Sequence, residues 1–207
     1  MEFSSKLIQE AVSAFSSLPG IGKKTALRMV MHIIQEDEEK VAHFTERIET
    51  LRRDIRFCEA CHNVSDEELC GICLDGQRNG KLICVVENFR DVISIESTGQ
   101  FNGKYYVLGH ILSPLDGIGP DQIPFEQLVK RVRDEEVQEL VMALSPNLQG
   151  DTTIFYLSKI MKDLPVKITG IARGVTFGAD LEYADEMTLG QAINKRLPMN
   201  KYIESIE

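Results

Sequence analysis

Four cysteines in this chain are arranged as two pairs with the same spacing. Cys58 and Cys61 are separated by two residues, Cys70 and Cys73 repeat that spacing, and eight residues lie between the pairs. A spacing of two residues lets both sulfurs of a pair point into one turn, and two such turns can close a tetrahedron around Zn²⁺. The spacing therefore predicts a structural zinc ion with four thiolate ligands and no open position for activating water.

Two alternatives to zinc remain open at this point. The segment Cys58–His62 reads Cys-Glu-Ala-Cys-His, which is the short pattern for haem attachment, but it leaves the second cysteine pair unexplained, and no export signal precedes it. Free or redox-active thiols are the other alternative. With zinc bound, His62 is a bystander. The fifth cysteine, Cys84, lies in an apolar run and is expected to be a small core residue.

Three helices are expected before the cysteines. Apolar residues recur at helical spacing over positions 7–15, 26–33 and 41–55. The first two of these segments are separated by the short break Pro19-Gly20-Ile21-Gly22. Two helices joined in this way are typical of a helix-hairpin-helix arrangement.

The hairpin turn combines the features of a phosphate-binding site. A turn from Gly20 to Gly22 exposes backbone N–H groups at the start of the second helix, where the helix dipole adds positive potential. Lys23, Lys24 and Arg28 follow, and no acidic residue lies between positions 18 and 34. Backbone amides and basic side chains hold phosphates without reading bases, so we expect salt-sensitive, sequence-independent DNA binding here. The alternative is an ordinary helical turn with a solvated basic face.

After the cysteines, strand and helix patterns alternate. Strands are expected over positions 81–87, 105–108, 139–144 and 166–172, and helices over 125–132 and 154–164. This alternation is typical of an α/β protein with a mainly parallel sheet and crossover helices. Thr188 and Gln191 are expected to form a capping box for a last helix that continues to Leu197.

An acidic residue follows the first expected strand, at the edge where α/β sheets bind ligands. This residue is Glu87, and Asp91 follows four residues later, so the two carboxylates could face each other and hold a divalent metal. Metal-dependent phosphoryl transfer would call for a further acid pair, but positions 145–151 supply only Asp151. Glu87 and Asp91 could equally be capping or surface-contact acids.

Taken together, the motifs resemble the bacterial recombination-repair family RecR over nearly the whole chain. The resemblance rests on the hairpin, the cysteines, the Val-Val-Glu strand end at 85–87, and the stretches 105–109, 112–120 and 181–186. It implies an α/β protein whose sheet is Toprim-like, the fold shared with primases and topoisomerases. The implied domains are a helix-hairpin-helix region at 1–56, a four-cysteine zinc module at 57–77, a Toprim domain at 78–175, and a helical C-terminal segment at 176–207 that takes part in oligomer contacts.

The resemblance also implies a function, that of a recombination mediator and DNA clamp that is not an enzyme. Such a protein acts with RecO and RecF to help load RecA on gapped single-stranded DNA, and it forms a tetrameric ring, built from dimers, that can encircle DNA. Lys23, Lys24 and Arg28 would contact DNA, and one structural Zn²⁺ would bind the four cysteines. Glu87 and Asp91 would face a partner or the ring interior. The implied location is the cytoplasm, in association with the nucleoid.

The chain departs from the family pattern at several positions. Among them, Tyr106 stands in place of His, His110 in place of Gly, and Gln149 in place of Glu. The missing acid at Gln149 weakens an alternative function, a Toprim metal-dependent phosphoryl-transfer enzyme such as a nuclease or primase-like protein. A further alternative is a zinc-stabilised adaptor that binds proteins and not DNA.

Net charge opposes DNA binding until its distribution is considered. The chain has 32 acidic and 23 basic side chains, for a net charge of −9. Lys23, Lys24 and Arg28 nevertheless form one basic patch, whereas acids gather at 36–39 and 134–139. We therefore expect one surface that repels DNA and another that holds it loosely. No uninterrupted apolar run exceeds five residues, so we expect no membrane-spanning segment.

Overall fold

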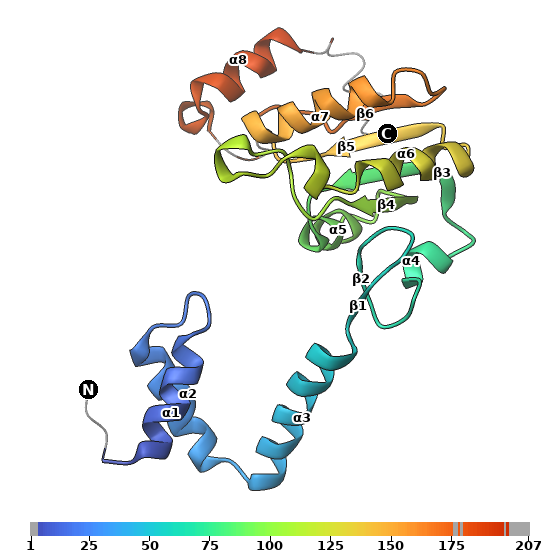
Figure 1. Ribbon diagram of the computed structural model, residues 1–207. Helices are drawn as coiled ribbons and strands as arrows, with labels where there is room; N and C mark the ends of the chain where they lie inside the picture. The colour runs from blue at the N-terminus through green and yellow to red at the C-terminus, as the bar shows by residue number, and fades with distance from the viewer. Residues whose placement is uncertain (1–3, 176–177, 179, 197, 199–207) are drawn as a thin grey trace. The chain divides into compact units, whose positions relative to one another are not determined.

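The computed structural model describes residues 4–175, 178, 180–196 and 198, and its elements are labelled in Figure 1. The chain divides into two compact units, residues 1–55 and 56–207. Among the described residues, no helix is both long enough and apolar enough to cross a membrane.

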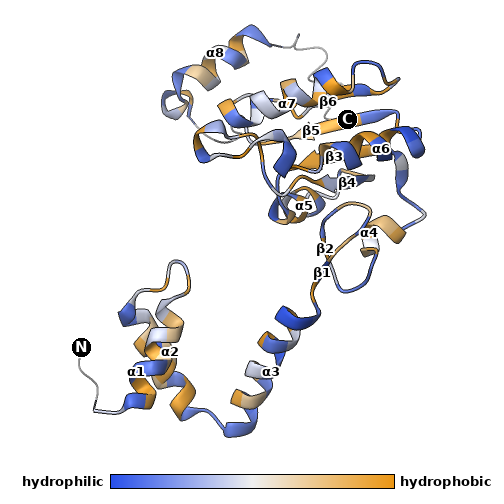
Figure 2. Cartoon of the chain, viewed as in Figure 1, coloured by the Kyte–Doolittle hydropathy of each residue, from blue (hydrophilic) through white to orange (hydrophobic). Residues whose placement is uncertain are grey.

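The described part of the first unit is helical. Its helices are α1 (Lys6–Ser16), α2 (Lys23–Gln35) and α3 (Glu38–Asp54). α1 packs against α2 around a small core of Val12, Ala26 and Val30, as the helical spacing predicts. α3 buries no side chain, and Figure 2 shows that it is largely hydrophilic.

The second unit begins with the cysteine-containing segment. Two short strands, β1 (Arg56–Phe57) and β2 (Val64–Ser65), pair in antiparallel fashion, and the one-turn helix α4 (Gly71–Leu74) follows. This small module leads directly into the first strand of the main sheet.

The main sheet has four parallel strands in the order β4-β3-β5-β6. The strands are β3 (Asn79–Val86), β4 (Gly103–Val107), β5 (Glu139–Ala143) and β6 (Lys167–Gly170). The helices between them are α5 (Phe89–Glu96), α6 (Phe125–Asp134) and α7 (Leu148–Ile160). Short 3₁₀ turns at Pro114–Asp116, Pro120–Gln122 and Leu181–Tyr183 and a last helix, α8 (Glu186–Asn194), complete the described elements. The predicted α/β class with a parallel sheet is confirmed.

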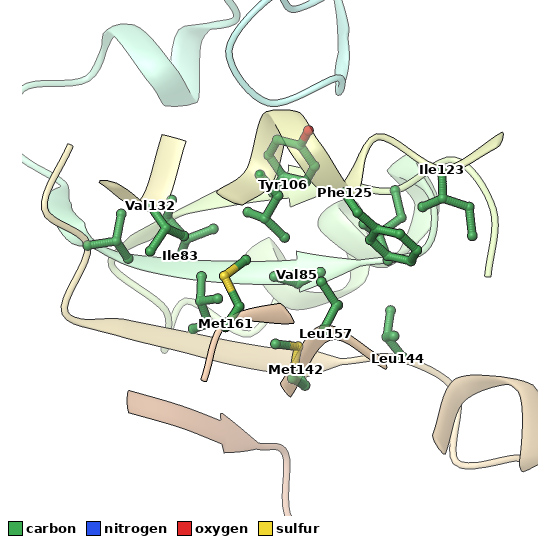
Figure 3. Packing of buried hydrophobic residues seen from close by; sticks show 14 of the residues in the cluster. Ile83, Val85, Tyr106, Ile123, Phe125, Val132, Met142, Leu144, Leu157 and Met161 are labelled. Carbon is green, nitrogen blue, oxygen red and sulfur yellow. The ribbon is translucent and has the colours of Figure 1, made fainter. Parts of the chain in front are cut away.

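Side chains on a strand alternate between the two faces of a sheet, so both faces of this sheet carry apolar residues. Helices cover both of these faces. Ile83 and Val85 of β3 pack with residues of α6 and α7 in the larger core (Figure 3). Cys84 and Val86 point to the other face and pack with Val92 of α5. The expectation that Cys84 is a core residue is confirmed, since its side chain is buried.

Two expected helix starts are wrong. α7 begins at Leu148 because the Asn147 side chain caps it by accepting a hydrogen bond from the Gly150 N–H. α8 begins at Glu186, where Asp185 is the N-cap and accepts from the Thr188 N–H at 2.9 Å. Thr188 is therefore inside the first turn and does not start a capping box with Gln191. Leu197, the expected end of this helix, lies outside the described residues.

Candidate metal centre and nucleic-acid interface

The four cysteines of the two pairs come together in one cluster. Their sulfur atoms all lie within 4.8 Å of one another, and the Sγ atoms of Cys61 and Cys70 are 3.5 Å apart. Ligands about 2.3 Å from a tetrahedral zinc are separated by about 3.8 Å from each other, so the cluster has the right size. Cys58, Cys61 and Cys70 are buried and Cys73 is partly buried. The cluster fits one structural zinc ion.

Backbone hydrogen bonds shape the loops that carry these sulfurs. The first pair lies on a tight turn in which the His62 N–H donates to the Cys58 carbonyl at 2.8 Å and His62 has a positive φ of 60°. The Cys70 N–H donates to the Cys58 sulfur at 3.3 Å and so ties the second pair to the first. His62 itself is outside the ligand cluster, and its ring lies against Tyr106 with 4.9 Å between centroids.

The cysteine module is fastened to the sheet by hydrogen bonds from three residues. The Val107 N–H of β4 donates to the Cys61 carbonyl at 2.8 Å, and the Lys104 ammonium donates to the Cys73 carbonyl at 3.0 Å. Arg131 of α6 donates to the Ala60 carbonyl at 2.8 Å. Because β4 is an edge strand of the sheet, the module covers part of an edge that would otherwise be open.

Arg131 also belongs to this site, although none of the sequence motifs includes it. It shares a helix with the buried apolar residues Leu128 and Val132, and its own side chain is only 8% exposed. A charged side chain on the buried face of an amphipathic helix is rare unless it is paired. A positive charge on the apolar face of this helix is therefore the sequence feature that could have indicated a buried, paired arginine.

Burial and hydrogen bonding set the cysteine and histidine pKa values in different directions. Burial raises the pKa of the Cys84 thiol to about 12, which suits an inert core residue. The hydrogen bond between Cys61 and Cys73 lowers the pKa of Cys73 and raises the pKa of Cys61, and the Arg131 charge also lowers the pKa of Cys73. Burial also lowers the pKa of His62, and Arg131 contributes. A thiolate is the form that binds zinc, so this pair places its negative charge on Cys73, and zinc binding releases the proton that Cys61 retains.

The hairpin of the first unit brings the predicted basic residues to the start of a helix. α2 begins at Lys23, directly after Gly22, and no side chain caps it. The first N–H groups of a helix have no acceptor within the helix, so those of α2 are available to an anion. The side chains of Lys23, Lys24 and Arg28 are exposed. Gly20 has a φ of 80°, a conformation that glycine adopts without strain.

The two acidic residues after β3 have different surroundings. Glu87 is partly buried directly beyond the strand, and its carbonyl accepts from the Gly109 N–H at 2.8 Å. The Asp91 carboxylate accepts from the Asn88 N–H at 3.0 Å and completes a capping box at the start of α5. Asp91 is thus used locally, in the manner of a capping acid.

The region beyond β5 offers no second acid pair. Asp151 forms an ion pair with Arg173, which lowers the pKa of the Asp151 carboxyl. Gln149 lies in the first turn of α7. Within the described residues, only the four cysteines bring together three or more candidate metal ligands.

Comparison with known proteins covers all of these regions. The sequence matches the family profiles described as RecR, helix-hairpin-helix (residues 8–52), the RecR zinc finger domain with four cysteine ligands (55–75), Toprim domain (81–172) and RecR, C-terminal (174–196). It is 50% identical to the recombination protein RecR of Amoebophilus asiaticus over 197 residues, which span 95% of this chain and 98% of that protein. The RecR of Flavobacterium johnsoniae is 49% identical over 97% of this chain and 98% of its own length. The chain belongs to the RecR family.

Membership in the RecR family supports a role in recombinational DNA repair. The RecR helix-hairpin-helix profile covers the exposed basic start of α2 and indicates DNA binding. The RecR zinc-finger profile covers all four clustered cysteines, so the predicted structural zinc is confirmed by sequence comparison and geometry together.

Proposed function

We propose that this protein is a recombination mediator and DNA clamp. In this role it binds DNA without sequence preference and acts with RecO and RecF to help load RecA on gapped single-stranded DNA. The observation that carries the proposal is the uncapped start of α2, where free backbone N–H groups lie next to the exposed side chains of Lys23, Lys24 and Arg28. Membership in the RecR family supports the remainder. The proposed location is the cytoplasm, with the DNA of the nucleoid.

The first test concerns the DNA contacts. Replacing Lys23, Lys24 and Arg28 by Ala should remove most DNA binding in an electrophoretic mobility assay at low salt, because each side chain neutralises phosphate charge. For the unchanged protein, log affinity should fall linearly with log salt concentration, and the triple variant should show a smaller slope. The backbone N–H groups at the start of α2 would remain, so some residual binding is expected.

A matched control separates this site from a general loss of positive charge. Lys159, Lys162 and Lys167 are exposed and belong to the second unit, so replacing these three by Ala removes the same charge elsewhere. The control variant should bind DNA nearly as well as the unchanged protein. Equal losses in the two variants would refute the hairpin assignment. No DNA binding by the unchanged protein at low salt would instead favour the protein-binding adaptor.

We further propose that the protein is not an enzyme and that Glu87 and Asp91 face a partner or the ring interior. The local use of Asp91 as a capping acid supports the non-catalytic role. Incubation of the zinc-loaded protein with Mg²⁺ and labelled DNA should produce neither cleavage nor strand synthesis. Activity that disappears in Glu87→Ala would establish the phosphoryl-transfer alternative.

The proposed assembly is a tetrameric ring built from dimers, in which the C-terminal segment takes part in subunit contacts. Large apolar side chains exposed in this segment support the proposal, namely Leu181, Tyr183, Met187 and Ile193. Multi-angle light scattering with and without gapped DNA should give a protein mass of two or of four chains of 23.3 kDa each. A monomer under both conditions would contradict the clamp.

A further inference from the structure

Arg131 is a buried cation that joins the zinc module to the sheet. Its side chain is 8% exposed, and one terminal nitrogen donates both to the Ala60 carbonyl at 2.8 Å and to the Tyr105 carbonyl at 3.0 Å. Ala60 belongs to the turn that carries the first cysteine pair, whereas Tyr105 belongs to β4. A single guanidinium nitrogen therefore bridges the metal-binding turn and the sheet edge.

A second hydrogen bond holds the same turn at the next residue. The carbonyl of Cys61, which follows Ala60, accepts from the Val107 N–H of β4 at 2.8 Å. Two successive carbonyls of the turn are thus held, one by a side chain and one by backbone. Residues that fix the orientation of metal ligands in this way typically affect metal affinity, because ligands held in place lose less freedom on binding.

The charge of Arg131 also suits its location. Four thiolates around one Zn²⁺ leave a net charge of two negative units, and burying uncompensated charge is costly. The ion pair with Glu135 uses the Arg131 Nε at 3.0 Å, but the Glu135 side chain is 42% exposed and can be solvated. The buried terminal nitrogen points its donors at the cysteine turn and β4.

We propose that Arg131 is a positioning residue of the zinc site, which holds the first cysteine turn against β4 and offsets the negative charge of the tetrathiolate. Its effect on zinc has two separable parts, the hydrogen bond to Ala60 and the positive charge. A neutral hydrogen-bond donor at this position would keep part of the hydrogen bond to Ala60 and lose the positive charge. A lysine would keep the charge without the bridging geometry of the guanidinium.

The test measures zinc affinity for Arg131→Gln and Arg131→Lys in the full-length protein, by competition with a chromophoric chelator. Loss of an outer partner of a metal ligand typically costs about 10- to 100-fold in affinity, and we expect this loss for Arg131→Gln. Arg131→Lys should recover part of it. The thiolate-to-metal charge-transfer band of the Co²⁺-substituted protein should also shift in Arg131→Gln, because the charge next to the sulfurs changes.

Arg78→Gln provides the matched control. Arg78 is another largely buried arginine of the same unit, with a side chain 16% exposed; its terminal nitrogens donate to Glu96 and the Gly103 carbonyl, and its Nε pairs with Asp75 at 3.5 Å, so it does not contact the turn of the first cysteine pair. This variant should lose thermal stability while keeping its zinc affinity and Co²⁺ spectrum. Far-UV circular dichroism establishes which variants fold.

Three results would overturn the proposal. The first is an unchanged zinc affinity in folded Arg131→Gln. The second is an equal loss of affinity in Arg131→Gln and Arg78→Gln, which would show that Arg131 acts only through general stability. If Arg131→Gln fails to fold, Arg131→Lys carries the test: an affinity and Co²⁺ spectrum equal to those of the unchanged protein would mean that the guanidinium geometry has no role.

Discussion

Cys58 and Cys84 are both buried cysteines, yet the structure gives them opposite chemistry. Cys58 lies in a cluster whose sulfurs are within 4.8 Å of one another, whereas Cys84 packs among apolar residues between β3 and α5. A thiolate can serve as a metal ligand only at Cys58, because zinc compensates its charge there.

We predict that Cys58→Ala and Cys84→Ala will differ sharply in stability. Cys58→Ala should abolish stoichiometric zinc binding and lower the free energy of unfolding by more than about 4 kcal/mol, a loss typical of a removed metal site. Cys84→Ala should cost about 1 kcal/mol and keep the zinc. Metal analysis and urea unfolding check both. A zinc-free Cys58→Ala protein of full stability would contradict the structural role.

Glu96 links α5 to the sheet through its side chain. Its carboxylate pairs with Arg78 and accepts from the Tyr105 hydroxyl at 2.7 Å. The Arg78 hydrogen bonds, with a smaller contribution from Tyr105, lower the pKa of Glu96. A carboxyl with a lowered folded-state pKa stabilises the protein above its unfolded-state pKa, and this contribution disappears as pH falls through the folded-state pKa.

Glu96→Gln should therefore destabilise the protein in a pH-dependent way. At pH 7 we expect a loss of about 1–2 kcal/mol, because a charge-assisted hydrogen-bond network becomes neutral. The difference between the two proteins should shrink as pH falls below the ordinary glutamate range. Urea unfolding of both proteins at each pH isolates Glu96 from the other acid-sensitive groups, including the zinc ligands. A difference that does not change with pH would argue against the ion pair.

At the scale of elements, the start of α7 depends on contacts that the sequence pattern does not reveal. The apolar spacing indicated a helix beginning near Ile154, but the Asn147 cap starts it at Leu148. A Cβ on Gly150 would lie 2.0 Å from the Ser145 carbonyl oxygen, so the turn requires glycine for close approach. Asparagine and glycine at these positions fit a loop as well as a helix start, so periodicity alone places the boundary poorly.

Two glycine substitutions test this account. Gly150→Ala should lower the free energy of unfolding by about 2 kcal/mol, because backbone must move to admit the methyl group. Gly190→Ala in α8 meets no atom within 4 Å and should raise stability by up to about 1 kcal/mol, since alanine favours a helix. Thermal unfolding of both variants checks the difference. Similar effects of the two substitutions would contradict the close contact at Gly150.

At the scale of the molecule, the second unit combines a metal module and a sheet into one structure. The Val107 N–H, the Lys104 ammonium and Arg131 all bind carbonyls of the cysteine module. The α1–α2 hairpin belongs to the other compact unit and has its own small core. Zinc should therefore stabilise the two units unequally.

Zinc removal by a chelator should act first on the edge of the sheet. Hydrogen exchange of the Val107 amide should accelerate by at least about tenfold, because the loop that supplies its acceptor is no longer held by metal. Amides of the α1–α2 hairpin should keep their protection, which provides an internal control. Equal acceleration in both units, or none at Val107, would show that the zinc module does not support β4.

Local features of this protein could be predicted from its residue pattern. The cysteine spacing predicted the zinc ligands, and the glycine and lysine pattern predicted the α1–α2 hairpin. The alternation of strand patterns with helix patterns predicted the parallel sheet. These signals extend over a few neighbouring residues, so periodicity and spacing capture them. The strand order, the use of Asp91 as a cap and the bridge from Arg131 to Ala60 emerge only from the three-dimensional packing of the chain. That bridge joins residues 71 positions apart, and no local pattern encodes which distant backbone a buried charge will meet.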